Sequence, residues 1–349
     1  MSDHKINPKK GVSTTVIILV LIVIVAIVGV GAYMYLSTST APAVTPTLPN
    51  MTLTVVALNG TEKILTSTDI ATLPQYTSLG GLVTSAGSIS RVLNYTGVPL
   101  STLCEMLGGF NSSISLLVTA ADGYSLAYSY EELVGNVTTY DPVTGDEVPH
   151  NEPLTPILAY FVNGTTPLPS SDGPLRLVYV GPEGLTTDGH NWIKNVVKIE
   201  LRPAVEEYTL ILNGTGVNGL LELMDRATFE SGVNCHGESW VDDKGTNWTG
   251  IPLWYLVGRV DDSNKHEDRA FNRTLADTGY NVMIIAEDGF AISLNSSFVK
   301  LNYNILLANL QNGTELDTKY WPLRLVGQDL TKDQMIRSVA EIQLIFNGS

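Results

Sequence analysis

The sequence predicts an α+β protein in which two tandem, strand-rich domains follow a single N-terminal transmembrane helix. Three observations lead to this expectation. An uncharged apolar segment stands near the N-terminus, five sequence blocks occur twice in the same order, and short β-type runs alternate with Gly, Pro and Asn. At 349 residues the chain is also long enough for two domains that each bury a core.

Residues 15–36, TVIILVLIVIVAIVGVGAYMYL, form the predicted membrane anchor. The segment has 22 residues and no charge, and a helix of that length spans about 33 Å, enough to cross the hydrocarbon core of a bilayer. Lys5, Lys9 and Lys10 precede it, and no Lys or Arg follows before Lys63. The positive-inside rule therefore predicts a single-pass protein of the cell membrane, with its N-terminus in the cytoplasm and the bulk of the chain extracellular.

Two alternative interpretations of the N-terminus stay open. A cleaved secretory signal has an apolar core of about 7 to 15 residues, which is shorter than this segment. The stretch KKGVSTTVIIL resembles the class III signals of archaeal pilin-like proteins, whose cleavage near Val12 would keep the apolar helix. The predicted order is a cytoplasmic segment (1–14), the anchor (15–36) and an extended Ser/Thr/Pro-rich linker (37–50).

The charge balance argues against a nucleic-acid partner. The formal net charge is −15 although only 16% of the residues are charged. An excess of carboxylates repels a phosphate backbone, and no run of Lys and Arg offsets it. The polar surface must therefore come largely from Ser, Thr, Asn and Tyr.

Asn-x-Ser/Thr sequons occur along the whole predicted extracellular part. They begin at Asn50, Asn59, Asn94, Asn111, Asn136, Asn163, Asn213, Asn247, Asn272, Asn295, Asn312 and Asn347. Their number favours a glycosylated envelope protein. Several stand in LNGT-like stretches, where Asn-Gly is also ordinary turn chemistry, so both interpretations stay open.

The repeated blocks divide the part after the linker into two units. The matching blocks are 57–73 with 211–229, 95–103 with 248–256, 119–133 with 285–299, 157–178 with 306–326, and 193–201 with 336–344. Five blocks in the same order at roughly constant offsets indicate a duplication. We therefore predict a first unit, residues 51–203, and a second unit, residues 207–347.

Local patterns predict the elements inside each unit. The β-type runs are LTVVAL (53–58), SLLVTA (115–120), LRLVYV (175–180) and YTLIL (208–212). Helices are expected at 99–107 and 252–260, where a proline precedes an apolar run. Residues 135–153 are an insertion of the first unit and residues 259–272 an insertion of the second, and both are expected to be solvated loops.

Taken together, the blocks resemble the molybdopterin-binding domain of the sulfite oxidase superfamily. In that family a Trp-x-Gly-Val-Pro-Leu segment leads into a helix, followed by Asp-Gly-Tyr, Leu-Ala-Tyr-x-x-Asn-Gly, Pro-Leu-Arg and a closing strand. The corresponding blocks occur in order in each unit, so the resemblance covers residues 51–347. It implies a molybdenum–molybdopterin cofactor and an oxidoreductase that transfers an oxygen atom or electrons with a small-molecule substrate.

The resemblance assigns the metal-ligand position to Cys235, which stands 13 residues before Trp248. A soft, deprotonated thiolate suits molybdenum, and cysteine provides one. The matching region of the first unit, residues 78–87, contains no thiol. His236 is the second catalytic candidate, because an imidazole beside a metal can relay protons near neutral pH.

Four basic residues are candidates for binding the pterin or the substrate. Lys194 and Arg337 match the basic position near the closing strand of the family, where the pterin phosphate is held. Arg176 and Arg324 belong to the Pro-Leu-Arg segments and offer a planar fork to an oxyanion, or equally to a carboxylate inside the fold. No arginine precedes Arg91, so the twin-arginine signal that exports cofactor-loaded enzymes is missing.

Two functions of different classes follow. The first is a membrane-anchored molybdopterin-dependent oxidoreductase, and the second is a cofactor-free cell-envelope glycoprotein that uses the same fold for binding or assembly. A pilin-like subunit is a third, weaker interpretation. A Cys104–Cys235 disulfide is permitted by the oxidising location. Otherwise we expect Cys104 to be a buried, inert thiol and Cys235 a metal ligand or a relic.

Overall fold

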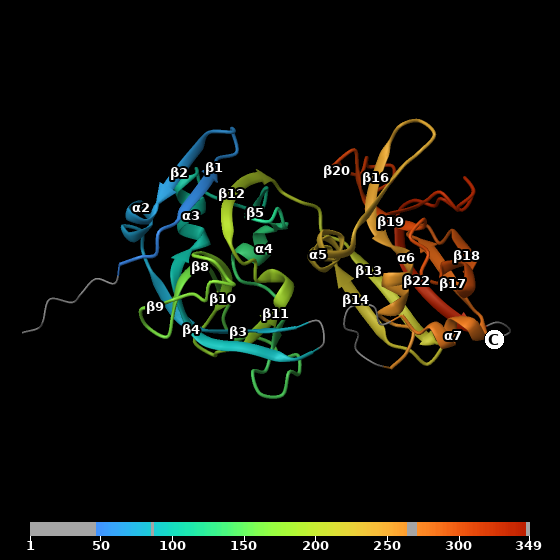
Figure 1. Ribbon diagram of the computed structural model, residues 1–349, viewed down its shortest axis with the longest axis horizontal. Helices are drawn as coiled ribbons and strands as arrows, with labels where there is room; N and C mark the ends of the chain where they lie inside the picture. Colours follow the sequence, from blue (N-terminus) through green and yellow to red (C-terminus); the bar gives the residue numbers. More distant parts are fainter. Residues whose placement is uncertain (1–46, 85–86, 264–270, 347–349) are drawn as a thin grey trace, which may run out of the picture. The chain divides into compact units, whose positions relative to one another are not determined.

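The computed structural model describes residues 47–84, 87–263 and 271–346. The predicted cytoplasmic segment, the anchor at 15–36 and most of the linker lie outside these residues, so the membrane expectation stays a prediction. Among the described residues, no helix is long and apolar enough to span a bilayer. The described part is strand-rich with short helices, in agreement with the expected class (Figure 1).

Each unit contains a five-stranded sheet, and the two sheets have the same strand order. The first is β2-β1-β12-β5-β6 and the second is β14-β13-β22-β17-β18. Their strands are β1 (Thr52–Val56), β2 (Glu62–Thr66), β5 (Ile114–Ala120), β6 (Ser125–Tyr128), β12 (Val196–Pro203), β13 (Thr209–Gly216), β14 (Leu221–Asp225), β17 (Tyr280–Ala286), β18 (Ala291–Asn295) and β22 (Val339–Phe346). In both sheets the first strand of the unit pairs in parallel with the last, and the other neighbours are antiparallel.

A second sheet completes each unit. In the first unit the order is β10-β8-β4-β3-β11-β7 with β9 on β8, and in the second it is β15-β16-β19-β20 with β21 on β19. The strands are β3 (Tyr76–Val83), β4 (Ile89–Pro99), β7 (Thr139–Tyr140), β8 (Thr155–Val162), β9 (Thr166–Pro167), β10 (Arg176–Val180), β11 (Thr186–Asp188), β15 (Glu238–Val241), β16 (Asn247–Pro252), β19 (Leu306–Gln311), β20 (Thr314–Glu315) and β21 (Arg324–Val326).

The insertion of the first unit is not simply a solvated loop, and that expectation is wrong in part. Residues 135–153 contribute β7, which pairs with β11 at the edge of the sheet. The Thr139 side chain is buried, and its hydroxyl donates to the carbonyl oxygen of Val148 at 2.5 Å. The polar composition did not indicate this strand because only two of its residues pair.

The expected helices are confirmed as α3 (Leu100–Met106) and α6 (Leu253–Gly258), each directly after a proline with φ near −55°. The other helices are α2 (Ser67–Ala71), α4 (Tyr130–Leu133), the 3-10 turn η1 (Gly189–Asn191), α5 (Arg226–His236), α7 (Arg273–Thr278) and α8 (Ser296–Val299). Our sequence analysis did not predict α5. It begins where the Asp225 carboxylate accepts a hydrogen bond from the Thr228 amide at 2.7 Å, an ordinary N-cap.

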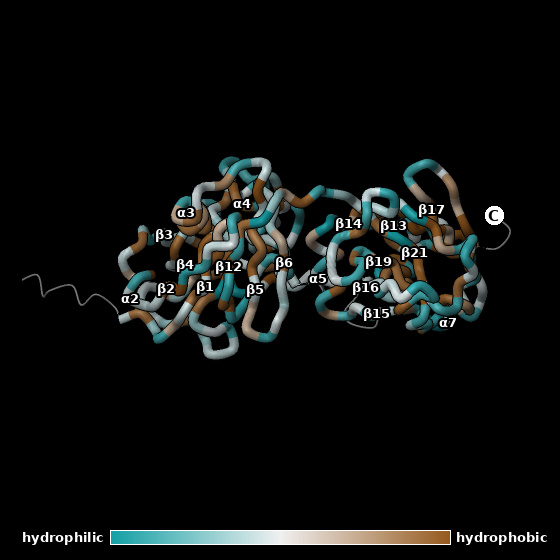
Figure 2. Tube along the Cα trace, turned by 90° about the horizontal axis from the view of Figure 1, so that it is seen from above, coloured by the Kyte–Doolittle hydropathy of each residue, from teal (hydrophilic) through white to brown (hydrophobic). Residues whose placement is uncertain are grey.

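The core follows the alternation of the strands. In β17 every second residue is buried, and the same pattern brings Val282 and Ile284 together with Leu212 and Ile342 in one apolar cluster. The first unit has its own clusters around Leu116 and around Trp192. Figure 2 shows apolar stretches (brown) along the sheet strands, with hydrophilic segments (teal) at many of the connections.

Candidate functional site

Cys235 lies in the last turn of α5 and is exposed to solvent. It is not joined to Cys104, so the disulfide alternative is wrong. Cys104 lies in α3 and is fully buried, and burial raises the pKa of its thiol to about 12. The expectation of a buried, inert Cys104 is therefore confirmed.

The surroundings of Cys235 come from both units. The Asn234 amide donates to the carbonyl oxygen of Ser125 at 2.6 Å, and the Tyr124 hydroxyl donates to the Ser231 hydroxyl at 2.9 Å. Burial raises the pKa of Tyr124 to about 12, Ser231 opposes the rise, and Cys235 adds to it. The cysteine thus lies near the hairpin that joins β5 to β6, whose Asp-Gly-Tyr segment turns at Gly123 with φ +91°.

His236 packs against an aromatic column. Its ring stacks on Tyr255 at 4.7 Å between centroids with 23° between the planes, and Tyr255 stacks on Trp254 at 3.8 Å. Trp254 is buried in the core of the second unit and serves packing. His236 also stands in the last turn of α5, where a positive charge is favourable to the helix dipole. Its catalytic role stays a prediction.

Arg176 is held inside the first unit by a carboxylate. Its Nη1 lies 2.9 Å from Oδ2 of Asp172, which also pairs with Arg91. Its guanidinium lies 5.4 Å from the ring centroid of Trp192. Burial lowers the pKa of Arg176 and the Asp172 carboxylate opposes that shift. Of the two alternatives from the sequence, an oxyanion or an internal carboxylate, the fold supplies the carboxylate.

Arg324 has different neighbours in the second unit. Its guanidinium carbon lies 4.0 Å from the ring centroid of Tyr320 and 4.4 Å from that of Trp248. The Trp248 indole in turn donates to the Asp242 carboxylate at 3.0 Å. Burial lowers the pKa of Arg324, and nearby Arg337 lowers it further while Tyr320 and Asp242 raise it. The arginine is therefore engaged with two aromatic faces.

Lys194 and Arg337 are both exposed and occupy equivalent places just before the last strand of each unit. Each is followed by a residue in the left-handed region, Asn195 with φ +53° and Ser338 with φ +52°. The two therefore match structurally as they do in sequence, but they belong to different units. Their assignment to a pterin phosphate stays a prediction.

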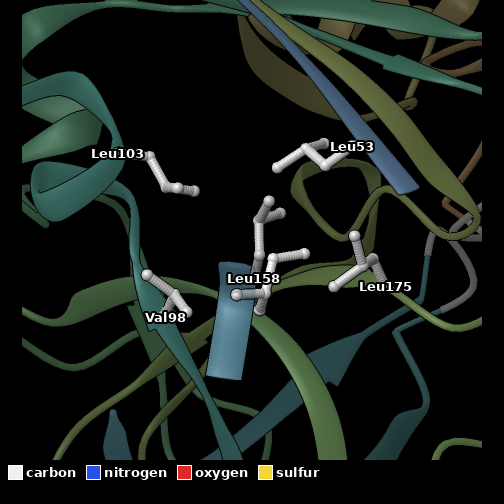
Figure 3. Close-up of a pocket in the computed structure, with 6 residues that line it drawn as sticks. Leu53, Val98, Leu103, Leu158 and Leu175 are labelled. Atoms are coloured by element: carbon white, nitrogen blue, oxygen red, sulfur yellow. The ribbon is translucent and has the colours of Figure 1, made fainter. Parts of the chain in front are cut away.

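Two cavities of the described part are small compared with a pterin cofactor. One is an apolar gap inside the first unit, without room for a water, lined by Leu53, Ile70, Val98, Leu103, Leu158 and Leu175 (Figure 3). Another, near Tyr208 and Trp321, has about 20 Å³, close to the space of one water. Ligand pockets usually measure about 300 to 1,000 Å³. Neither cavity is lined by Cys235, Arg324 or Arg337.

The side chains that could bind a metal or a pterin are arranged as follows. In the part of the chain that the structure describes, no group of three His, Cys, Asp or Glu side chains is placed to bind a metal. Arg176 is committed to an ion pair and Arg324 to two rings. As arranged, Arg176 and Arg324 therefore do not fit the pterin-binding or substrate-binding role that the resemblance assigned to them.

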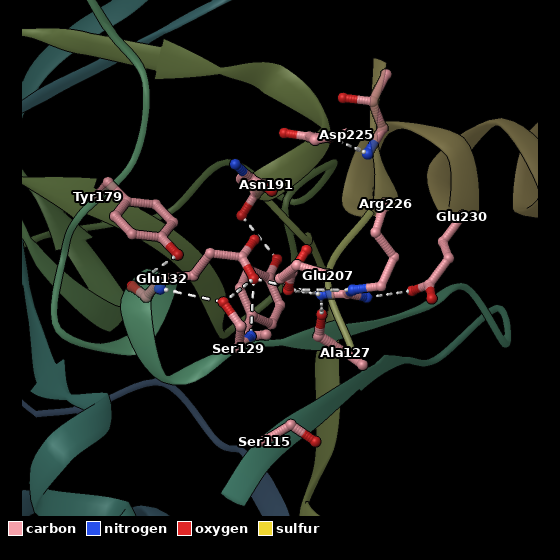
Figure 4. A network of polar contacts seen from close by, with 12 residues as sticks. Ser115, Ala127, Ser129, Glu132, Tyr179, Asn191, Glu207, Asp225, Arg226 and Glu230 are labelled. Carbon is pink, nitrogen blue, oxygen red and sulfur yellow. Dashed lines mark hydrogen bonds and ion pairs between the residues drawn. The ribbon is translucent and has the colours of Figure 1, made fainter. Parts of the chain in front are cut away.

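Our sequence analysis did not predict the buried charge cluster centred on Arg226, the first residue of α5 (Figure 4). Its side chain is only 2% exposed. The guanidinium donates to the carbonyl oxygen of Ala127 at 2.7 Å, to Glu230 at 2.8 Å and to Glu207 at 3.1 Å, and it lies 3.4 Å from Glu132. Residues from both units meet here, within the compact body that begins at Leu48.

Burial raises the pKa of Glu132 to about 7, although Arg226 and Ser129 lower it. Burial also raises the pKa of Glu230, again against Arg226. The repeat alignment contained a signal for this cluster. Asp225 corresponds to Thr66, the N-cap of α2, so Arg226 stands where the first unit has Ser67.

Comparisons with known proteins complete the description of the site. No family model matches the chain, and no curated protein matches it. A solved structure, the sulfane dehydrogenase SoxCD from Paracoccus pantotrophus, is similar at 16% identity with a TM-score of 0.35, covering 84% of this chain and 74% of that one.

Proposed function

We propose that this chain is a membrane-tethered, extracytoplasmic module that uses a sulfite-oxidase-like fold for binding or assembly, without a molybdenum cofactor. The observation that carries the proposal is the state of the residues assigned to the cofactor. Arg176 is paired with buried Asp172, Arg324 is packed between Trp248 and Tyr320, and Cys235 is exposed at the end of a helix.

The charge cluster at Arg226 supports a binding or assembly role in another way. A guanidinium that contacts a carbonyl of one unit and carboxylates of the other couples the two units through a buried contact. Breaking a buried ion pair is costly, since it leaves an uncompensated charge. Such a coupling suits a module that presents two units together to a partner.

The decisive experiment is metal analysis of the full-length protein purified from its native membranes. We expect molybdenum far below one atom per chain, and the same result for Cys235→Ser. One molybdenum per wild-type chain, lost in Cys235→Ser, would overturn the cofactor-free proposal.

The location is tested separately by protease treatment of intact cells that carry an epitope tag at each end of the chain. The expected result is loss of the C-terminal tag and survival of the N-terminal tag. Protection of the C-terminal tag in intact cells, followed by digestion after lysis, would contradict the predicted topology.

The molybdopterin-dependent oxidoreductase is the second candidate, and one observation favours it. Cys235 is exposed and does not form a disulfide, so its sulfur is accessible to a soft metal. The metal analysis above distinguishes this candidate from the first.

A further inference from the structure

Each unit brings two of its sequons into direct contact. In the first unit the Asn163 amide donates to the carbonyl oxygen of Asn94 at 2.8 Å, and the Asn94 amide donates to Oδ1 of Asn163 at 3.3 Å. In the second unit the Asn312 amide donates to the carbonyl oxygen of Asn247 at 2.7 Å, and the Asn247 amide donates to Oδ1 of Asn312 at 2.9 Å. The same pairing of one turn sequon with one strand sequon therefore occurs twice.

The turn sequons are Asn163-Gly164-Thr165 and Asn312-Gly313-Thr314. They form the tips of the β8–β9 and β19–β20 hairpins, and every residue in them is exposed. In each, Asn and Gly have positive φ, as Asn-Gly turns favour. The loop has three residues between paired Val162 and Thr166, and two between paired Gln311 and Thr314. Because Oδ1 accepts a hydrogen bond from the neighbouring strand, the Nδ2 branch of the same amide group is directed away from that contact.

The strand sequon of the first unit is built into the sheet. Asn94, Tyr95 and Thr96 all lie in β4. Tyr95 is 1% exposed, Thr96 is 8% exposed, and the Thr96 hydroxyl lies 2.8 Å from that of Thr77 on β3. A modifying enzyme that needs both the amide and the hydroxyl of the motif would have to remove this strand from the sheet.

The strand sequon of the second unit is arranged similarly. Asn247, Trp248 and Thr249 lie in β16, and Trp248 is 2% exposed beneath Arg324. The Thr249 hydroxyl lies 2.8 Å from that of Ser239 on β15. The middle residue is thus part of the core and the hydroxyl is already engaged across the strands.

Turn chemistry explains only part of the exposed motifs. A tight hairpin favours Asn-Gly, but it does not require a hydroxyl on the following residue. Thr165 and Thr314 are both exposed and both complete the glycosylation motif. Two adjacent residues of an antiparallel pair lie only about 5 Å apart, so one bulky oligosaccharide would cover the other member of each pair.

We propose that Asn163 in the first unit and Asn312 in the second each carry an N-linked oligosaccharide, and that their partners Asn94 and Asn247 stay unmodified. The donor is an oligosaccharide linked through phosphate to a membrane lipid. Nδ2 forms a bond to the anomeric carbon of the first sugar, the bond from that carbon to the phosphate oxygen breaks, the lipid phosphate leaves, and the amide loses one proton to the transferring enzyme.

This inference rests on the extracytoplasmic location proposed above. The test is glycopeptide mass spectrometry on the full chain from its native membranes, with gel mobility of variants. Thr165→Ala and Thr314→Ala remove the motif but keep each Asn-Gly turn, so each is expected to lose the mass of one oligosaccharide. Thr165→Ser and Thr314→Ser retain the motif and are the matched controls, expected to keep the wild-type mass.

For the strand sequons the expected result is no change. Thr96→Ala and Thr249→Ala should leave the number of oligosaccharides as in the wild type. An oligosaccharide on Asn94 or Asn247, or unmodified Asn163 and Asn312, would overturn the inference. If protease treatment places the chain outside the cell and Asn163 and Asn312 are bare, only the glycosylation inference fails. If protease treatment places the chain inside the cell, the proposed location is wrong, and the glycosylation inference that rests on it is wrong as well.

Discussion

Arg176 in the first unit and Arg324 in the second occupy equivalent positions but contact different side chains. Both follow Pro-Leu at the start of a strand, β10 or β21, and both lie against a tryptophan ring. The residue four positions earlier differs. It is Asp172 in the first unit and Tyr320 in the second, and each contacts its arginine. The repeated Pro-Leu-Arg motif therefore determines where the arginine lies. The residue four positions earlier determines whether the arginine forms an ion pair or a cation–π contact.

The largest expected effect comes from removing the first-unit carboxylate. Asp172→Ala leaves the buried Arg176 without its ion pair, and also frees Arg91, which is more exposed. We expect the free energy of unfolding to fall by about 3 kcal/mol, because an uncompensated buried charge is costly. Urea unfolding followed by tryptophan fluorescence measures it, with Arg91→Ala as a milder control. A loss below about 1 kcal/mol, as for a surface pair, would contradict this account.

The second expected effect concerns Arg226, which stands where the first unit has Ser67, and its partner Glu132. The pKa of Glu132 is raised by burial to about 7, so the folded protein binds this proton more tightly than the unfolded chain. The stabilisation from this group is present below the unfolded pKa and is lost as pH rises through about 7. Over that range it amounts to at most about 3 kcal/mol.

Glu132→Gln permanently mimics the protonated form, which isolates this contribution. Wild type should gain stability relative to Glu132→Gln as pH falls from 8 to 5, in unfolding curves recorded across that range. Parallel pH profiles for the two proteins would show that Glu132 is not the titrating group.

A smaller effect is expected at the second-unit arginine. Tyr320→Ala removes one of the two rings that cover Arg324 and should lower the free energy of unfolding by about 1 to 2 kcal/mol through lost cation–π and packing contacts. Tyr320→Phe keeps the ring and is the matched control, with little change expected. Equal losses for Ala and Phe would mean that the hydroxyl, rather than the ring, matters.

The smallest effect is expected at a core position that both units fill with a small side chain. Cys104 in α3 corresponds to Val257 in α6, and both are fully buried. Cys104→Val makes the first unit resemble the second and should change the free energy of unfolding by less than about 1.5 kcal/mol, measured by thermal and urea unfolding. A larger loss would indicate that the two helices pack differently.

Much of the fold could be predicted because its signals are local. Short β-type runs predicted β1, β5, β10 and β13, and a proline before an apolar run predicted α3 and α6. The block repeat is matched by the same strand order in the two five-stranded sheets, although the division into two domains of common origin stays an inference. These patterns depend on residues that are adjacent in the sequence, so they can be read from the sequence alone.

The candidate site was less predictable because it depends on distant partners. The sequence identified Arg176 and Arg324 but could not decide between an oxyanion and an internal contact, since that depends on which side chains the sheets bring near. It missed α5, whose polar composition hides the helix that carries Cys235, and therefore also missed the cluster at Arg226. The roles of Cys235, His236, Lys194 and Arg337 toward a cofactor stay predictions.

The parallel pairing of the first and last strands within each unit has a mechanical consequence. A pull between the start of β1 and the end of β12 acts in opposite directions along neighbouring parallel strands, so their hydrogen bonds bear the load together rather than one after another. The same geometry recurs between β13 and β22. A force applied through the linker would therefore load the β1–β12 pair in shear. A force applied at the C-terminus would load the β13–β22 pair in the same way.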